Sequence, residues 1–243
     1  MHNEADDPQH REVVLSGKWY RLIPSRFPTI ELYERVATPA QGLILKEIEM
    51  LTNPRKLQRD SLAPNPGAAH GSSPRFQNWN HAPFAYPNRA GSRYLDPTNF
   101  ALEVYDSLDA ALAVSIRLRE TFLAATDQPR IAIDMRVLRH QFSGTFADRT
   151  MDPPDFPQQA RWEIGARLLE AEKHGVSFTC PDLPRCRGVS IFTPSVLQQA
   201  TQAEHYRFLW DGSKISAIYL CTLEGDDDQA AVLPQDILAK PPV

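Results

Sequence analysis

The stretch Gly91-Ser92-Arg93-Tyr94-Leu95-Asp96-Pro97 sets a cation in a glycine- and proline-containing turn, directly before an apolar strand pattern and a long helix pattern. Gly91 allows the backbone to approach a ligand closely. The guanidinium of Arg93 offers a planar fork of donors that suits phosphate or carboxylate. The stretch therefore predicts an anion clamp. The alternative role for Arg93 is a solvated side chain or an ion pair that braces the loop.

The hydrophobic pattern around this stretch predicts its setting. Residues 100–105 read as a strand, and Ser107 is placed to cap a helix whose apolar residues recur at helical spacing to residue 122. Residues 206–210 and 215–219 flank Asp211-Gly212, which favours the turn of a β-hairpin. We expect a disordered N-terminal segment over residues 1–16, one domain over 17–222, and an acidic, flexible tail over 223–243.

Composition excludes several classes of function. The formal net charge is −4 and the chain has no run of Lys and Arg, so a nucleic-acid partner is not expected. No apolar stretch approaches the ~20 residues of a membrane span, and the first residues lack the pattern of a secretion signal, so we expect a cytoplasmic protein. The three cysteines lack metal-ligand spacing. We therefore expect no metal and free thiols.

The order of several short motifs carries a family resemblance. The chain presents, in sequence, residues 19–24 (WYRLIP), 81–84 (HAPF), the 91–97 stretch, a helix opening at 107–114 (SLDAALAV), 175–180 (GVSFTC) and 191–194 (IFTP). This order resembles the RES-domain family, bacterial toxins named for an arginine, a glutamate and a serine, usually encoded beside an Xre-type antitoxin. The resemblance implies an α+β fold: a compact single domain with a mixed sheet and packed helices, related to ADP-ribosyltransferases.

The name-giving residues of that family fall on particular positions here. The arginine falls on Arg93. The position that usually holds a tyrosine at the end of the next strand falls on Glu103, and Tyr105 would point to the same face of that strand. The family's glutamate falls on Val114, and its serine falls on Cys180. One name-giving residue of three is therefore retained.

These positions define the candidate site. The catalytic candidates are Arg93, Glu103 and Cys180, and the ligand-binding candidates are Arg21, Arg93, Tyr94, Tyr105 and His81. Each has a structural alternative. Arg21 would be a strand-surface cation and Glu103 a solvent-facing edge residue. Cys180 would be a small buried hydrophobe, and His81 a structural or exposed histidine.

Two functional hypotheses follow from the resemblance. The first is an enzyme that cleaves NAD+ at the nicotinamide–ribose bond by hydrolysis or phosphorolysis, with NAD+ as substrate, no resident cofactor, and an Xre-type antitoxin as protein partner. Such a site must hold the pyrophosphate, stabilise an oxocarbenium-like ribose and admit water or phosphate. The second is a RES fold without turnover that binds a nucleotide or a protein. The replacements at Val114 and Cys180 favour the second hypothesis, and the retained Arg93 favours the first.

Overall fold

The computed structural model describes residues 11–25, 78–85, 88, 90–221 and 234–239. In this part of the chain, seven strands form one mixed sheet and helices pack on it, so the expected α+β class is confirmed. The strands are β1 (Glu12–Pro24), β2 (Leu102–Tyr105), β3 (Ile131–Arg149), β4 (Gly175–Thr179), β5 (Arg187–Ile191), β6 (Leu197–Trp210) and β7 (Ile215–Cys221). The helices are α3 (Asn78–Ala85), α4 (Leu108–Ala124), α5 (Gln158–Glu170), α6 (Pro234–Ala239) and the short 3-10 turn η2 (Pro194–Val196).

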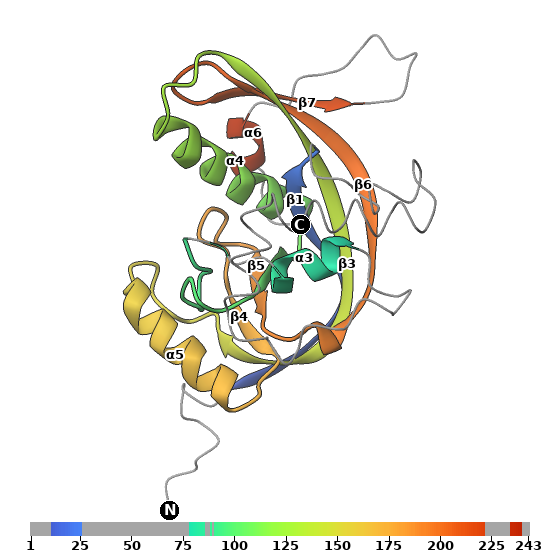
Figure 1. Ribbon diagram of the computed structural model, residues 1–243, viewed down its shortest axis with the longest axis vertical. Helices are drawn as coiled ribbons and strands as arrows, with labels where there is room; N and C mark the ends of the chain where they lie inside the picture. Colours follow the sequence, from blue (N-terminus) through green and yellow to red (C-terminus); the bar gives the residue numbers. More distant parts are fainter. Residues whose placement is uncertain (1–10, 26–77, 86–87, 89, 222–233, 240–243) are drawn as a thin grey trace, which may run out of the picture.

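The sheet curls so that the pairings of five of its strands form a closed ring. The strand order is β1-β2-β5-β4-β3-β6-β7, and β1 also pairs with β3, so that β1, β2, β5, β4 and β3 form a ring. The pair of β3 with β4 is parallel, and the other pairs are antiparallel. Figure 1 shows β3 and β6 as a long curved pair along one side, with α4 and α5 on the other side.

Three apolar clusters fill the space between these layers. One contains side chains from β1, β2, β3 and β5 together with Phe84 of α3, so the ring of strands encloses a core. A second lies between α4 and the strands β3, β6 and β7. The third joins the 91–97 stretch, α4 and β4, and includes Tyr94, Tyr105 and Phe178. The candidate site lies beside the first and third clusters.

Local sequence explains the elements that carry the site. Ser107 accepts a hydrogen bond from the backbone N–H of Ala110 at 3.1 Å, which caps α4 as expected, and Asp109 in the first turn complements the helix dipole. The β6–β7 hairpin turns at Asp211-Gly212, where Gly212 has a φ of 104°. Both predicted elements are confirmed.

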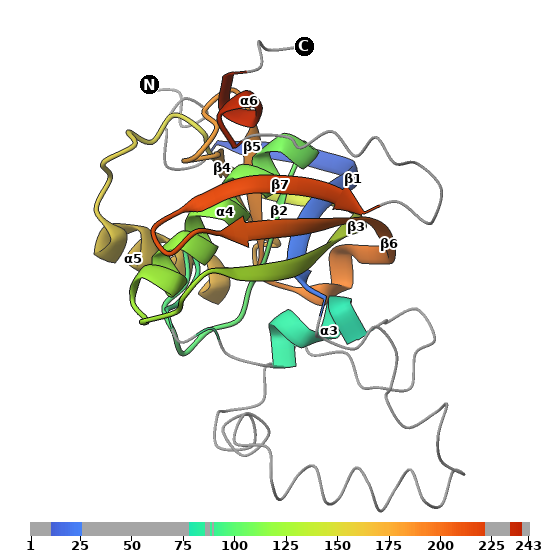
Figure 2. The same ribbon diagram turned by 90° about the horizontal axis from the view of Figure 1, so that it is seen from above.

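The domain boundaries differ from those expected. Glu12–Ser16 belong to β1, because they pair with β3 residue by residue, so this part of the segment assigned to disorder is a strand. Within the segment assigned to a flexible tail, Pro234–Ala239 form α6. Its Ile237 is 1% exposed, and its carbonyl accepts a hydrogen bond from Arg185 Nη2 at 3.0 Å. The acidic run in residues 223–243 led to the prediction of a flexible tail, although the segment also contains apolar residues such as Ile237. Figure 2 shows α6 and α3 at opposite ends of the molecule.

Candidate functional site

A polar pocket of about 120 Å³ opens where β1 and β2 separate. The two strands share one described bridge, between Tyr20 and Tyr105. Arg21 and Glu103 lie just beyond it, and both line the pocket. The other lining residues come from α3 and from the loop before β2: Pro83, Asn88, Ser92, Asn99, Phe100 and Ala101. The Arg21 cation of β1 and the Glu103 carboxylate of β2 therefore line the same pocket.

Glu103 is the acidic group of this pocket. Its Oε1 accepts a hydrogen bond from the backbone N–H of Arg93 at 2.6 Å, which fixes the carboxylate against the 91–97 stretch. Burial raises the pKa of Glu103, while the Arg93 N–H and the charges of Arg21 and Arg93 oppose that rise. The side chain is half-buried rather than solvent-facing. The carboxylate is therefore fixed in place at the pocket, where burial disfavours its charged form and the cations of Arg21 and Arg93 favour it.

Arg21 is the cation on the opposite wall. Its guanidinium makes no hydrogen bond or ion pair with the described residues. Burial lowers its pKa, and the charge of Glu103 opposes this. An arginine remains protonated even so, with five donors to satisfy. A half-buried guanidinium whose donors have no described protein partner is suited to a polar or anionic ligand.

The 91–97 stretch is held rigidly by α5. Gly91 has a φ of 72°, and a Cβ there would lie 2.9 Å from the Leu95 carbonyl oxygen. Trp162 Nε1 donates to the Ser92 carbonyl at 3.0 Å, and Gln158 Nε2 donates to the Arg93 carbonyl at 2.9 Å. Close packing against its own loop and α5, rather than approach to a ligand, is thus the structural reason for a glycine at position 91.

Arg93 does not line the pocket with its side chain. Its guanidinium carbon lies 5.1 Å from the centre of the Phe178 ring, a cation–π contact on the side of the third apolar cluster. Its Nε is buried and has no hydrogen-bond partner in the described part of the chain. The alternative role for Arg93, an ion pair that braces the loop, is not found among the described residues. The backbone N–H of Arg93 binds the Glu103 carboxylate, and its guanidinium remains available for an anion.

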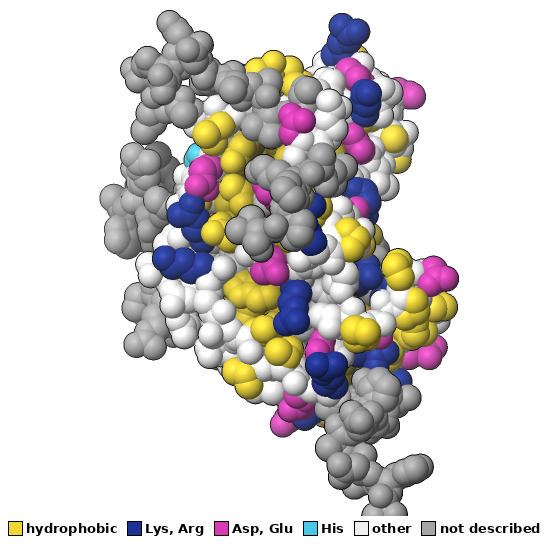
Figure 3. Space-filling view, turned by 180° about the vertical axis from the view of Figure 1, so that it is seen from behind, with side chains coloured by type: hydrophobic (Ala, Val, Ile, Leu, Met, Phe, Trp, Pro, Cys, Tyr) yellow, Lys and Arg dark blue, Asp and Glu magenta, His cyan; other side chains and the backbone are white. Residues whose placement is uncertain are grey.

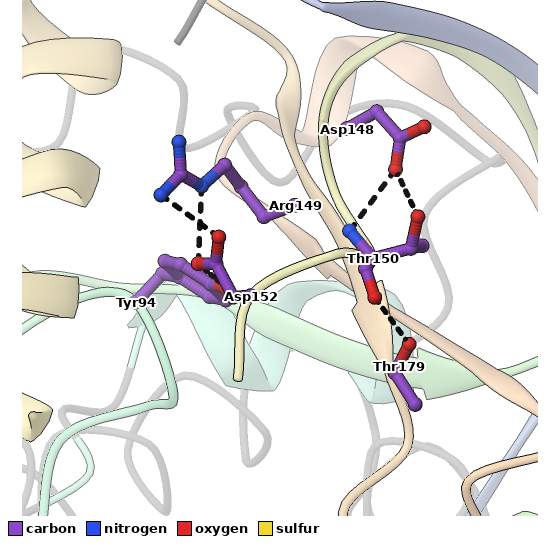
Figure 4. A network of polar contacts seen from close by, with 6 residues as sticks. All are labelled: Tyr94, Asp148, Arg149, Thr150, Asp152 and Thr179. Carbon is purple, nitrogen blue, oxygen red and sulfur yellow. Dashed lines mark hydrogen bonds and ion pairs between the residues drawn. The ribbon is translucent and has the colours of Figure 1, made fainter. Parts of the chain in front are cut away.

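Tyr94 is a structural residue in this arrangement. It is 0% exposed, and its hydroxyl donates to Asp152 Oδ2 at 3.1 Å. Arg149 pairs with the same carboxylate at 2.8 Å, and Figure 4 shows the Tyr94 hydroxyl and the Arg149 guanidinium meeting at Asp152. Burial and the nearby carboxylate raise the pKa of Tyr94 well above its ordinary value. Tyr94 does not contact the pocket.

Tyr105 points to the same side of β2 as Glu103 by strand alternation, but it lies in the third apolar cluster and is 5% exposed. Val114 and Cys180 lie in the same cluster. Cys180 is 0% exposed, and burial raises the pKa of its thiol to about 11. Cys180 is therefore a buried hydrophobe rather than a group at the pocket. Val114 packs in the core, so this position supplies no carboxylate.

The remaining candidate, His81, lies in α3, but its side chain is outside the described residues. A second histidine, His140, was not among the predicted site residues. His140 is 0% exposed, and its Nδ1 lies 2.6 Å from Oδ1 of Asn80, which is 1% exposed. Burial, with the charge of Arg21, lowers the pKa of His140 to about 3. His140 is therefore neutral, and it is close enough to Arg21 to feel its charge.

Sequence reasoning did not predict six lining residues of the pocket: Pro83, Asn88, Ser92, Asn99, Phe100 and Ala101. Ser92 lies within the predicted anion clamp and Asn99 two residues after it, so their proximity to Arg93 in the sequence was the available signal. Asn99 Nδ2 donates to Asp96 Oδ1 at 3.1 Å, and Ser92 Oγ accepts from the Leu95 N–H at 3.0 Å. Both side chains therefore hold the loop as well as lining the pocket.

The outer surface shows no extended field of one charge sign on the face in Figure 3, where Lys and Arg alternate with Asp and Glu. In the part of the chain that the structure describes, no helix is long and apolar enough to cross a membrane. No group of three or more His, Cys, Asp or Glu side chains among the described residues could hold a metal ion. Cys180, Cys186 and Cys221 are free cysteines.

Comparison with known proteins shows the family to which the chain belongs. No protein family model matches the chain. The uncharacterized protein y4oC of Sinorhizobium fredii (strain NBRC 101917 / NGR234) is 37% identical over 224 residues, which cover 91% of this chain and 95% of y4oC. The chain belongs to the y4oC family.

A solved structure shows a weaker similarity. It is the crystal structure of the M. tuberculosis MbcT-MbcA toxin-antitoxin complex, of which one chain is 11% identical, with a TM-score of 0.41. The match covers 80% of this chain and 87% of that chain. At this TM-score the similarity decides neither the fold family nor the function of the y4oC family.

Proposed function

We propose that this protein is a RES-type enzyme that cleaves NAD+ at the nicotinamide–ribose bond. The observation that carries the proposal is the presence, in one pocket, of the Glu103 carboxylate and the Arg21 guanidinium, which has no hydrogen-bond partner among the described residues. The backbone N–H of Arg93 holds that carboxylate in place. Arg93 belongs to the 91–97 stretch, which carries part of the resemblance to the RES family. Cleavage of this bond requires a negative charge near the ribose and cations that bind the phosphates.

The chemistry assigned to the pocket is simple. The bond between ribose C1′ and the nicotinamide nitrogen breaks, and its electron pair neutralises the positively charged pyridinium ring. The ribose develops oxocarbenium character, which the Glu103 carboxylate stabilises electrostatically. Water then adds to C1′ and releases a proton, giving ADP-ribose and nicotinamide. In phosphorolysis, a phosphate oxygen takes the place of water. Arg21 binds a phosphate or ribose oxygen of the substrate.

The same resemblance supplies the proposed biology. A chain that consumes NAD+ is toxic when free, and we propose an Xre-type antitoxin as its protein partner. Co-expression provides a direct test: a growth defect caused by this chain should require Glu103 and should be relieved by the antitoxin. A growth defect that survives Glu103→Gln would separate toxicity from NAD+ cleavage.

A binding module without turnover is the second candidate, and one observation favours it. Val114 and Cys180, at the positions of the family's glutamate and serine, are 5% and 0% exposed in one apolar cluster. Neither supplies a charge or a donor to the pocket. Under this hypothesis, the pocket binds a nucleotide but releases no nicotinamide.

Incubation of the full chain with NAD+, with and without phosphate, tests both candidates through nicotinamide release. The enzyme hypothesis expects release by the wild type and loss of about 100-fold or more in Glu103→Gln, the size typical of a lost electrostatic stabiliser. Glu170, an exposed carboxylate on α5, provides the matched control Glu170→Gln, which should retain full activity. Binding of NAD+ without release would favour the module, and neither binding nor release would reject both.

A further inference from the structure

The loop between β4 and β5 begins and ends with a cysteine. The register of the two strands ends with the pair Thr179 and Arg187. One position further on, the N–H of Cys180 donates to the carbonyl of Cys186 at 2.9 Å, which continues the antiparallel pairing. Residues that lie directly opposite each other in an antiparallel pair present their side chains on the same face. Cys180 and Cys186 are therefore cross-strand neighbours.

Packing agrees with this placement of the two side chains. Strand alternation puts Cys180 on the face of β4 that carries Phe178, and both residues belong to the third apolar cluster. Cys186 is partly buried and packs against that same cluster. Burial is the main cause of the raised pKa of the Cys180 thiol, and the charge of Cys186 contributes to the rise. The two thiols therefore lie close together on one side of the hairpin.

The spacing of the backbone at this point suits a disulfide bond. Directly opposite residues of antiparallel strands have Cα atoms about 4.5–5.5 Å apart, and disulfides join residues whose Cα atoms are about 4.4–6.8 Å apart. Two turns close the loop: the Leu183 N–H donates to the Cys180 carbonyl at 3.3 Å, and the Cys186 N–H donates to the Leu183 carbonyl at 2.9 Å. Both cysteines are free thiols in this structure. A bond between them therefore requires no change in the pairing of the strands.

The two thiols differ in their access to solvent. Cys186 is half-buried, and its Sγ lies 3.2 Å from the hydroxyl oxygen of Ser107, the residue that caps α4. Cys180 is 0% exposed. A dissolved oxidant therefore reaches Cys186 first, and Cys180 reacts only with a sulfur that lies beside it. Cys186 is thus placed as the attacking cysteine and Cys180 as the resolving one.

The residues between the two cysteines hold two helices against the strands. Asp182 pairs with Arg117 of α4 at 2.6 Å. Arg185 Nη2 donates to the carbonyl of Ile237 in α6 at 3.0 Å. Leu183 is 2% exposed and packs in the third apolar cluster. A bond between the cysteines closes the base of the loop that anchors α4 and α6.

We propose that Cys180 and Cys186 form a reversible redox site, which a peroxide oxidises to a disulfide. The Cys186 thiolate attacks one oxygen of hydrogen peroxide, the O–O bond breaks, and a sulfenic acid and hydroxide result. The Cys180 thiol then loses its proton and attacks the Cys186 sulfur, which forms the S–S bond and expels the second oxygen as hydroxide. The two hydroxides take up the protons that the thiols lost, so two thiols and one peroxide give one disulfide and two waters. An added dithiol reverses the reaction by thiol–disulfide exchange.

Peptide mapping of the full-length protein tests the site. The protein is treated with hydrogen peroxide, its remaining thiols are blocked with iodoacetamide, and it is digested with trypsin in the absence of a reductant. Trypsin cleaves after Arg185, which lies between the two cysteines, so only a disulfide keeps them together. The expected product joins residues 174–185 to the dipeptide Cys186-Arg187, and it is lighter by two hydrogen atoms than the two free peptides combined. It should arise from the monomer and disappear after treatment with dithiothreitol.

Three cysteine variants assign the bond. Cys221 is an exposed thiol on β7, which β3 and β6 separate from β4 in the sheet, so Cys221→Ser is the matched control and should form the linked peptide as the wild type does. Cys186→Ser should lose the linked peptide and keep Cys180 as a free thiol, because burial protects it from the oxidant. Cys180→Ala keeps the test valid should Cys186→Ser fail to fold, as judged by its melting temperature (Tm). Without the resolving thiol, Cys186 of that variant should be oxidised further to a sulfinic acid.

Three results for the folded wild type would overturn the proposal. They are recovery of Cys180 and Cys186 as free thiols after peroxide, a sulfinic acid at Cys186 without any linked peptide, and a linked peptide that arises only from dimers. The measurement does not involve NAD+, so its result is independent of the cleavage hypothesis.

Discussion

The backbone N–H of Arg93 donates to Glu103 Oε1 at 2.6 Å, so the two residues are coupled through the main chain rather than through an ion pair of side chains. The Arg93 guanidinium turns the other way, over the ring of Phe178. Substitution of the Arg93 side chain therefore leaves the contact that positions Glu103 in place. The contributions of the two residues can be separated by mutation.

Arg93→Ala should weaken binding of NAD+ and ADP-ribose while leaving the fold intact. Loss of one charge-assisted contact costs ~1.5–3 kcal/mol, or about one to two powers of ten in affinity. Calorimetric titration measures this change, with Arg130→Ala as the exposed control. Wild-type affinity in a folded Arg93→Ala protein would exclude a clamp role for this side chain.

The pH dependence of stability should reveal the burial of Glu103. Its folded pKa is raised above the ordinary value of 4.5, so the native state holds this proton to higher pH than the unfolded state does. The associated stability is present below pH 4.5 and is lost as pH rises through the folded pKa. The Tm of Glu103→Gln relative to wild type should therefore increase from pH 4 to pH 7. A constant or falling difference would contradict a raised pKa.

His140 should contribute to acid unfolding with the opposite sign. Its pKa is about 3 in the fold and 6.5 ordinarily, so below pH 6.5 the unfolded state binds a proton that the native state refuses. Stability should fall as pH decreases from 6.5 toward 3, by about 3 kcal/mol at pH 4. His140→Gln should show a shallower loss of stability with acid in denaturant titrations.

Gly165→Ala should destabilise the protein, although alanine favours a helix by about 1 kcal/mol over glycine. A Cβ at position 165 would overlap the Tyr94 carbonyl oxygen, so α5 would have to move away from the 91–97 stretch. We expect a loss of about 2–4 kcal/mol, the range of severe packing defects. Thermal unfolding measures it, and a rise in Tm would show that the helix–loop contact is looser than described.

Ile237→Ala should cost about 2–4 kcal/mol, because it removes a buried branched side chain from the cluster beneath α4. Gln235→Ala, on the exposed side of α6, should change stability by less than about 0.5 kcal/mol. Equal Tm values for these two variants would restore the expectation of a dispensable tail. A truncation after Leu223 should behave like Ile237→Ala or worse.

Local patterns in the sequence were sufficient for the α4 cap at Ser107, the hairpin at Asp211-Gly212 and the alternation that puts Glu103 and Tyr105 on one side of β2. Each depends on neighbouring residues alone. The net charge and the three free cysteines were likewise readable without a fold. The α+β class followed from a resemblance that spans the motifs rather than from any one of them.

Tertiary structure alone decided which candidates share a pocket. Arg21 and Glu103 are 82 positions apart, and they meet because β1 and β2 separate after one bridge. Tyr94 and Cys180 have the residue types of a site, but their burial depends on α4, α5 and β4, which reach them from distant parts of the chain. A sequence states which side chains a chain possesses, whereas long-range packing determines which of them lose water and face one another.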